Sequence, residues 1–103
     1  MKITMKQAGA NLSIKEAFKD FVVAQTAKGV SDKTVETYHA HFRSIGKHLD
    51  TNLPIDVLKQ TDLDRMVVSM RQSGLAHNSI SSYLRVFRTF LNWCAGQGYT
   101  ALN

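Results

Sequence analysis

The sequence predicts an all-α fold, a compact bundle of four helices, and three observations predict it. Apolar residues recur at spacings of three and four along most of the chain, which is typical of helices that bury one face. Residues that favour helix caps precede these segments, and glycine or proline follows them. No stretch shows the alternation of apolar and polar residues that a half-buried β-strand requires.

The first helix is predicted over residues 14–28. Ser13 and Glu16 have the spacing of a capping box, in which each side chain accepts a hydrogen bond from a free backbone N–H group at the helix start. Its apolar side chains fall on one face and are Ile14, Ala17, Phe18, Phe21 and Val22. Lys28 and Gly29 supply a basic last turn and a stop.

The second helix is predicted to begin after a cap at Ser31 or Asp32 and to run to about Leu49. Its apolar stripe repeats over two heptads and consists of Val35, Tyr38, Phe42, Ile45 and Leu49. Residues 50–54 (DTNLP) then break the pattern, because Asp and Asn favour turns and Pro disfavours helix in the residue before it. The connecting loop is expected to send two apolar side chains into the core, Ile55 and Leu58.

The third helix is predicted to begin with Thr61 as its N-cap. Asp62 and Asp64 would then lie in the first turn, where the helix dipole favours acidic groups. Its buried stripe is expected to be Leu63, Met66, Val67 and Met70. Ser73 and Gly74 are expected to end it.

The fourth helix is predicted to be capped within the polar run 77–79 (HNS) and to reach about Ala95, before Gly96 and Gly98. Its apolar residues cover a wide arc made of Ile80, Tyr83, Leu84, Phe87, Phe90, Leu91 and Cys94, widened by Val86 and Trp93. So broad an arc predicts a central helix that contacts several others.

The length of 103 residues is that of a single domain with one core. Cys94 is the only cysteine, so a disulfide within the chain and a cysteine-based zinc site are both excluded. The four histidines lack ligand spacing, and no nucleotide-binding motif or Ser-His-Asp arrangement is evident, so no metal, cofactor or catalytic residue is expected. Without a long apolar run or a signal-peptide pattern, a cytoplasmic protein with no membrane partner is expected.

Charge is unevenly distributed in the chain. There are 13 Lys and Arg against 8 Asp and Glu, and residues 74–103 contain no acidic residue. Within the predicted fourth helix, a polar stripe follows at steps of four, three and four and consists of Ser81, Arg85, Arg88 and Asn92. Because arginine presents a fork of donors that matches phosphate oxygens, and no acid lies nearby in the sequence, this stripe indicates a nucleic-acid surface rather than a merely solvated face.

A second basic face is predicted on the second helix. Lys33, Arg43 and Lys47 would project within about 80° of one another, with the small residue Ala40 between them. Glu36 lies in the same sector and weakens the positive potential there. Two basic faces on separate helices favour nucleic-acid binding more strongly than either face does alone.

Several segments together resemble the N-terminal core-binding domain of tyrosine recombinases, the phage-integrase family. The segments are Phe18 and Phe21, residues 29–38 (GVSDKTVETY), residues 75–93 (LAHNSISSYLRVFRTFLNW), the Gly98-Tyr99 pair and Asn103. Each motif is loose, but their order and separation resemble the family pattern over residues 13–103. The resemblance implies a SAM-like orthogonal bundle of four helices that forms half of a C-shaped clamp around double-stranded DNA.

In such clamps the second and fourth helices face the DNA. The resemblance implies that the DNA-binding residues are Lys33, Thr34, Arg43, Lys47, Ser79, Ser81, Ser82, Arg85 and Arg88. Residues 1–12 would form a tail or arm and residues 13–103 the core-binding domain. The catalytic domain of the family is absent from the sequence, so the chain is expected to be part of a longer recombinase and not an enzyme by itself. Expected partners are duplex DNA, that catalytic domain and further copies assembled on DNA.

Two other functions remain open at this point. The wide apolar arc, with Trp93 and Tyr99 near its end, is compatible with a helical protein–protein interaction domain that does not bind DNA. A helix-turn-helix regulator would need a tight turn, which residues 73–76 could supply. The predicted central position of the fourth helix disfavours its insertion as a recognition helix.

Overall fold

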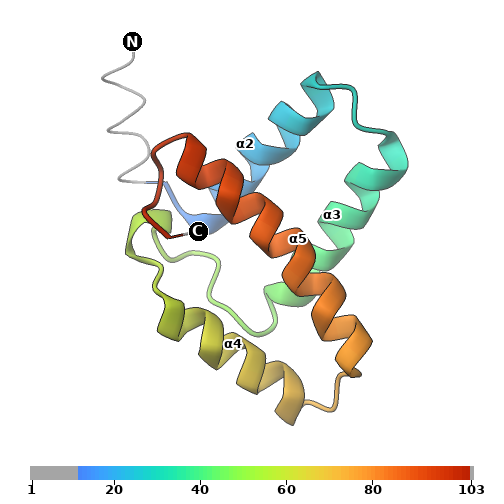
Figure 1. The fold of residues 1–103 in the computed structure, drawn as a ribbon, viewed down its shortest axis with the longest axis vertical. Coiled ribbons are helices and arrows are strands. Elements are labelled where there is room, and N and C mark those ends of the chain that lie inside the picture. The colour runs from blue at the N-terminus through green and yellow to red at the C-terminus, as the bar shows by residue number, and fades with distance from the viewer. Residues whose placement is uncertain (1–11, 103) are drawn as a thin grey trace.

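The computed structural model describes residues 12–102 (Figure 1). The predicted all-α fold is confirmed: within this range the chain forms four α-helices and one short 3₁₀-helix, and no β-strand. The elements are α2 (Ile14–Ala27), α3 (Asp32–Ile45), η1 (Ile55–Val57), α4 (Gln60–Gln72) and α5 (His77–Gly96). Residues 1–11 and Asn103, which include most of the predicted tail and the last residue of the predicted family pattern, lie outside the described range.

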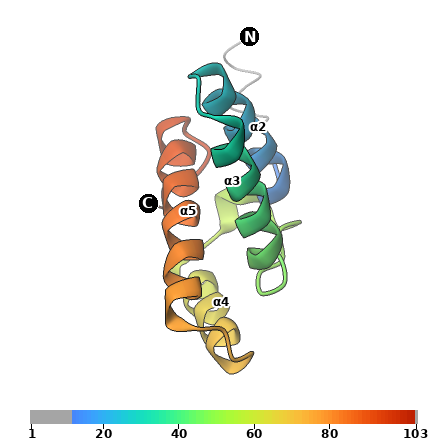
Figure 2. The ribbon, with the colours of Figure 1, turned by 90° about the vertical axis from the view of Figure 1, so that its right-hand side faces the viewer.

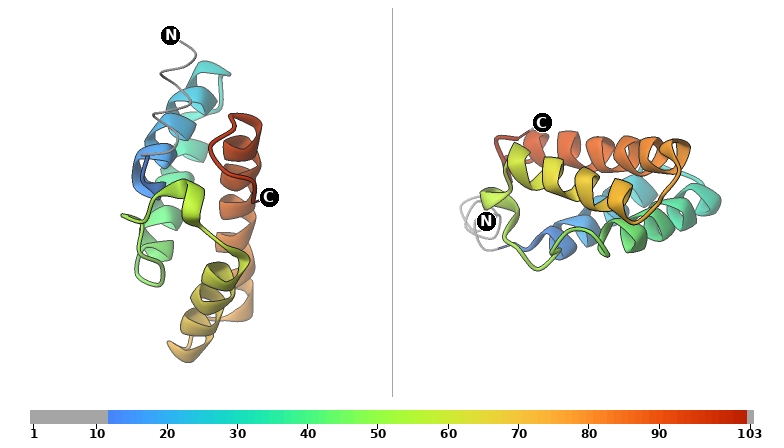
Figure 3. Two further views of the ribbon diagram at one scale, coloured as in Figure 1. Left: turned by 90° about the vertical axis from the view of Figure 1, so that its left-hand side faces the viewer. Right: turned by 90° about the horizontal axis from the view of Figure 1, so that it is seen from below.

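The helices form two layers that cross each other. Figures 2 and 3 show α2 and α3 on one side, with α5 on the other and α4 beside the N-terminal half of α5. α5 packs against each of the other three α-helices, as its wide apolar arc predicts. None of the helices in residues 12–102 combines the length and apolar character that crossing a bilayer requires.

Local signals determine both ends of α2. The predicted capping box is confirmed, since the Glu16 N–H donates to Ser13 Oγ and the Ser13 N–H donates to Glu16 Oε1, each over 3.0 Å. At the other end, Lys28 is the C-cap and Gly29 has a φ of 92°. Because a side chain is strained in this left-handed conformation, glycine allows the chain to leave the helix there.

The predicted end of the second helix is wrong. Ser31 caps α3 as expected, but α3 ends at Ile45, with Gly46 as C-cap, and not near Leu49. Leu49 is nevertheless buried, 8% exposed, because the turn after the helix returns it to the core. His48 holds this turn against α4 through a hydrogen bond of 2.8 Å between its Nδ1 and Ser69 Oγ.

The predicted caps of the last two helices are also corrected. α4 begins two residues before the predicted start, with Lys59 as N-cap, where Asp62 Oδ2 accepts a hydrogen bond from the Lys59 N–H at 2.9 Å. The hydroxyl of Thr61 therefore does not cap this helix. α5 begins at His77 after Ala76, which has no side chain able to accept the cap hydrogen bond.

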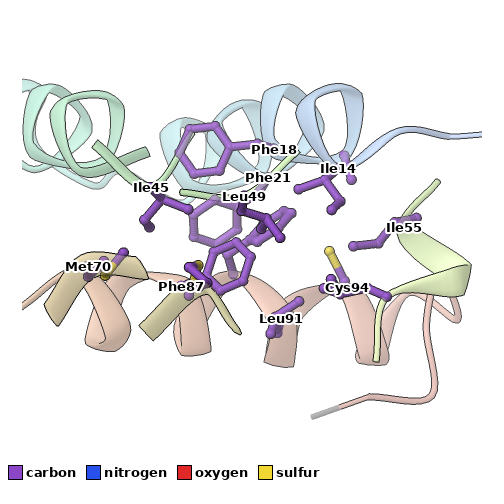
Figure 4. Close-up of a cluster of buried hydrophobic side chains, with 14 of the residues drawn as sticks. Ile14, Phe18, Phe21, Ile45, Leu49, Ile55, Met70, Phe87, Leu91 and Cys94 are labelled. Carbon is purple, nitrogen blue, oxygen red and sulfur yellow. The ribbon is translucent and has the colours of Figure 1, made fainter. Parts of the chain in front are cut away.

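One hydrophobic core joins the two layers. Figure 4 shows Phe18 and Phe21 on the α2 side and Phe87 and Leu91 on the α5 side, facing one another. The loop contributes as predicted, since Ile55 and Leu58 are among the buried residues, 0% and 4% exposed. Two backbone hydrogen bonds connect this loop to the start of α2 and to the residues before it. The Ile14 N–H donates to the Leu53 carbonyl at 2.9 Å, and the Ile55 N–H donates to the Leu12 carbonyl at 2.8 Å.

Candidate nucleic-acid interface

A hollow lies on the outer face of α5, and we refer to it as the α5 hollow. It measures about 350 Å³ and is lined by Ser81, Leu84, Arg85, Arg88, Thr89 and Asn92. Both arginine side chains are exposed. The four polar residues predicted as one stripe from their spacing therefore line a single concave surface, and no carboxylate is among its lining residues.

Helix geometry explains why these side chains share the outer face. Arg85 and Arg88 are three positions apart, which separates them by about 60° around the helix axis. Phe87, only 2% exposed, projects about 160° away from Arg85. Burial of Phe87 and its apolar neighbours in the core thus directs the two arginines toward solvent.

Arg88 also borders a second depression, the α4–α5 groove, of about 280 Å³. Its apolar floor includes Val67 of α4 and Leu91 of α5, and Asp64 belongs to its lining. The sequence places no acid near Arg88 along the chain, but the packing of α4 brings one to the same groove. Asp64 Oδ1 accepts a hydrogen bond from Gln60 Nε2 at 3.1 Å.

The basic residues of the second helix are arranged differently from the prediction. Lys33 and Arg43 lie in the first and last turns of α3, and both are exposed. Lys47 is exposed as well, but it lies beyond the end of α3 at Ile45. Helix geometry therefore does not align Lys47 with the other two residues. The predicted angle of about 80° applies only to Lys33 and Arg43.

The hydroxyl residues of the predicted set are half-buried. Thr34 participates in the cap of α3, since its N–H donates to Ser31 Oγ at 3.2 Å and the two hydroxyls lie 3.0 Å apart. Ser79 and Ser82 lie on α5 but do not line the α5 hollow, whereas Ser81 does. Of the three serines, which the sequence shows as one polar run, only Ser81 could therefore contact a ligand in the α5 hollow.

α3 and α5 contact each other through His41 and Tyr83, whose ring centroids lie 5.1 Å apart. Arg43 is two positions beyond His41, which turns it about 160° away from that contact. Its side chain therefore faces away from α5. The residues that line the α5 hollow all belong to α5, so no basic residue of α3 is part of it.

Other residues at this surface are absent from the predicted DNA-binding set, among them Asn92, which the sequence places only in the polar stripe. Thr89 lines the α5 hollow, and its position four residues after Arg85 is the signal that identifies it from sequence. Asp64 borders the groove beside Arg88, and no sequence signal reveals it, because the contact depends on how α4 packs.

Other chemistries find little support in residues 12–102. No group of three His, Cys, Asp or Glu side chains in this range is placed to hold a metal ion. Burial raises the pKa of the Cys94 thiol to about 12, with a smaller contribution from Asp20. A thiol with so high a pKa stays protonated near neutral pH and is a poor nucleophile.

Comparison with known proteins gives one match. Residues 17–98 of the 103-residue chain match the model of the phage integrase N-terminal SAM-like domain. The matched segment begins within α2, contains the whole of α3, α4 and α5, and includes the α5 hollow. No curated protein and no solved structure matches the chain significantly.

Proposed function

The chain belongs to the family of phage integrase N-terminal SAM-like domains, and from this premise we propose that it is the DNA-binding module of a site-specific tyrosine recombinase. In this proposal α5 makes the principal contact with duplex DNA and α3 a secondary one. A separate catalytic domain of the same protein carries out strand exchange. The module supplies affinity and positions the duplex for that domain.

The observation that carries the proposal is the exposed pair Arg85 and Arg88 at the α5 hollow. Two fixed positive charges, three residues apart on a rigid helix, suit the phosphate backbone, whose contacts dominate protein–DNA affinity. Among residues 12–102, neither guanidinium forms a hydrogen bond or an ion pair. Both are therefore available to a ligand without loss of an internal partner.

The α3 residues have unequal parts in this proposal. Lys33 and Arg43 lie at opposite ends of α3, and Arg43 lies about 160° around the helix axis from His41, which contacts α5. We therefore propose that Arg85 and Arg88 contribute more to affinity than Arg43 does.

The competing function, a protein–protein interaction domain, has weaker support. Its motivation is the aromatic pair Trp93 and Tyr99, but these rings pack on each other with centroids 5.6 Å apart. Trp93 also contacts Phe21 of α2, with centroids 5.8 Å apart. Both rings thus have partners within the domain, and the large hydrophobic side chains that are exposed in residues 12–102 are three valines, none of them aromatic.

Fluorescence anisotropy with a labelled duplex of about 30 base pairs, titrated at several salt concentrations, tests the proposal. Four to six phosphate contacts predict that log K falls with log salt at a slope of about −4 to −5. A slope near zero, or no binding at low salt by folded protein, would reject DNA binding. Sedimentation of the same sample, with Trp93→Ala for comparison, would then test self-association as the competing function.

A further inference from the structure

The α5 hollow combines two charged donors with two neutral ones. Arg85 and Arg88 both line it, Ser81 lies one turn before Arg85, and Asn92 lies one turn after Arg88. Neither the Ser81 hydroxyl nor the Asn92 amide forms a hydrogen bond within the described part of the chain. All four side chains can therefore donate to a ligand from one side of a single helix.

Thr89 has a different part in the hollow. Its hydroxyl donates to the backbone carbonyl of Arg85 at 3.0 Å, so its proton is already used. Thr89 and Leu84 therefore shape the wall and floor of the hollow, and the donors are the remaining four residues. This separates the residues expected to bind a ligand from those that only give the hollow its form.

From this arrangement we infer that the α5 hollow is a binding site, or seat, for one backbone phosphate of DNA. Arg85 and Arg88 supply positive charge to this site, and Ser81 and Asn92 supply neutral hydrogen-bond donors. The inference rests on the proposed function, because it takes DNA as the source of the phosphate. Guanidinium groups pair with phosphate oxygens through two parallel hydrogen bonds, which makes them suited to such a seat. The hollow has room for a phosphate group together with ordered water.

A phosphate fits this lining better than the edge of a base does. Reading a guanine employs one arginine against the O6 and N7 atoms, whereas two adjacent arginines match a group that carries negative charge. Asn92 and Ser81 would then fix the position of the phosphate along α5. Such a contact sets register and orientation of the duplex without dependence on its sequence.

The first test uses inorganic phosphate as the probe. Titration of the ¹⁵N-labelled protein with sodium phosphate, against sodium chloride at equal ionic strength, should shift the resonances of Arg85, Arg88 and Asn92 in a saturable manner. Resonances of Lys15 and Lys19 on α2 serve as the reference for non-specific effects. Shifts that are equal at both sets of residues, or absent from the hollow, would overturn the inference.

The second test compares the duplex affinity of two variants with the same substitution. Asn92→Leu should weaken binding by about fivefold to tenfold for every duplex sequence, because one hydrogen bond at a solvent-exposed surface is lost. Asn52→Leu, on the exposed loop before η1, should bind like the wild type. Ser81→Ala is expected to act in the same direction as Asn92→Leu.

The outcomes separate the seat from the proposed function. If the wild type binds no duplex, the proposed function and the inference fail together. If the wild type binds with a steep salt dependence but Asn92→Leu and Ser81→Ala match it, the seat is rejected and DNA binding stands. If the variants lose affinity only for duplexes with one particular base at one position, the hollow reads a base, and the inference is overturned.

Discussion

The imidazole of His41 lies edge-on to the ring of Tyr83, with an angle of 70° between the ring planes. This contact joins α3 to α5, the two helices proposed to bind DNA. His41 Nδ1 is buried and has no hydrogen-bond partner within the described residues. Burial lowers the pKa of His41 below its ordinary value of 6.5, because a charged ring would require an unpaired N–H group inside the contact.

Stability should consequently fall as the solution is acidified through pH 6.5. In the window between the lowered pKa of folded His41 and the ordinary value, the unfolded chain binds the proton and the folded chain does not. The contribution of His41 is thus fully present above that window and is lost as pH falls through it. Urea unfolding of the wild type and of His41→Phe should show that the substitution reduces this pH dependence.

Tyr83→Phe serves as the control for the pH experiment. It keeps the aromatic ring that covers His41 and removes only the hydroxyl, so it should retain the pH dependence of the wild type. Parallel curves for the wild type and His41→Phe would show that protonation of His41 does not oppose folding.

Ala76→Ser should stabilise the domain by about 1 kcal/mol. Ala76 is the exposed N-cap of α5 and has the extended backbone, with ψ of 148°, in which a serine hydroxyl accepts a hydrogen bond from the first turn. Ala27→Ser, at the last residue of α2, has no such bond to gain and should be neutral or slightly destabilising. A urea midpoint for Ala76→Ser no higher than that of the wild type would contradict this account of the helix start.

Phe21→Ala should cost about 3–5 kcal/mol of unfolding free energy. Phe21 is 0% exposed, and its ring packs on those of Tyr38, Phe90 and Trp93, which belong to α3 and α5. Val23→Ala on the same helix is the control, because Val23 is 68% exposed and should change stability by less than about 0.5 kcal/mol. Equal effects of the two substitutions would mean that the core is not centred on Phe21.

Asp64→Asn should strengthen duplex binding by about twofold to fivefold at low salt, since it removes a negative charge from the groove that Arg88 borders. The gain should shrink as salt is added, because screening weakens the repulsion between the carboxylate and DNA. Asp56→Asn on η1 removes the same charge from a residue that borders neither depression. Anisotropy curves that coincide for the two variants would place Asp64 outside the DNA-binding surface.

The predictable part of the fold depends on interactions between near neighbours in the sequence. The Ser13–Glu16 capping box and the buried stripe of α5 follow from spacings of three and four, which the structure retains. The end of α3 does not follow in this way, because Leu49 has the spacing of a helical core residue and yet is buried from a turn. That turn is held by the tertiary bond between His48 and Ser69, which no local pattern encodes.

The candidate site also has one part that near neighbours in the sequence determine and another part that tertiary packing determines. The Ser81 to Asn92 stripe is predictable because one helix positions all of its members. The position of Lys47 beyond the end of α3 and the approach of Asp64 to the groove beside Arg88 depend on how the helices pack. Their positions could be known only once the packing of α3 and α4 on α5 was determined.

The most direct test of DNA binding through α5 compares two variants that each lose two positive charges. Arg85→Ala/Arg88→Ala removes the pair at the α5 hollow, and Lys15→Ala/Lys19→Ala removes two exposed charges from α2, in the other layer. If DNA binds through α5, the arginine variant alone loses at least about tenfold in affinity, and its salt slope becomes shallower by about two. Equal, small losses for both variants would contradict this prediction, because binding would then depend on net charge and not on α5.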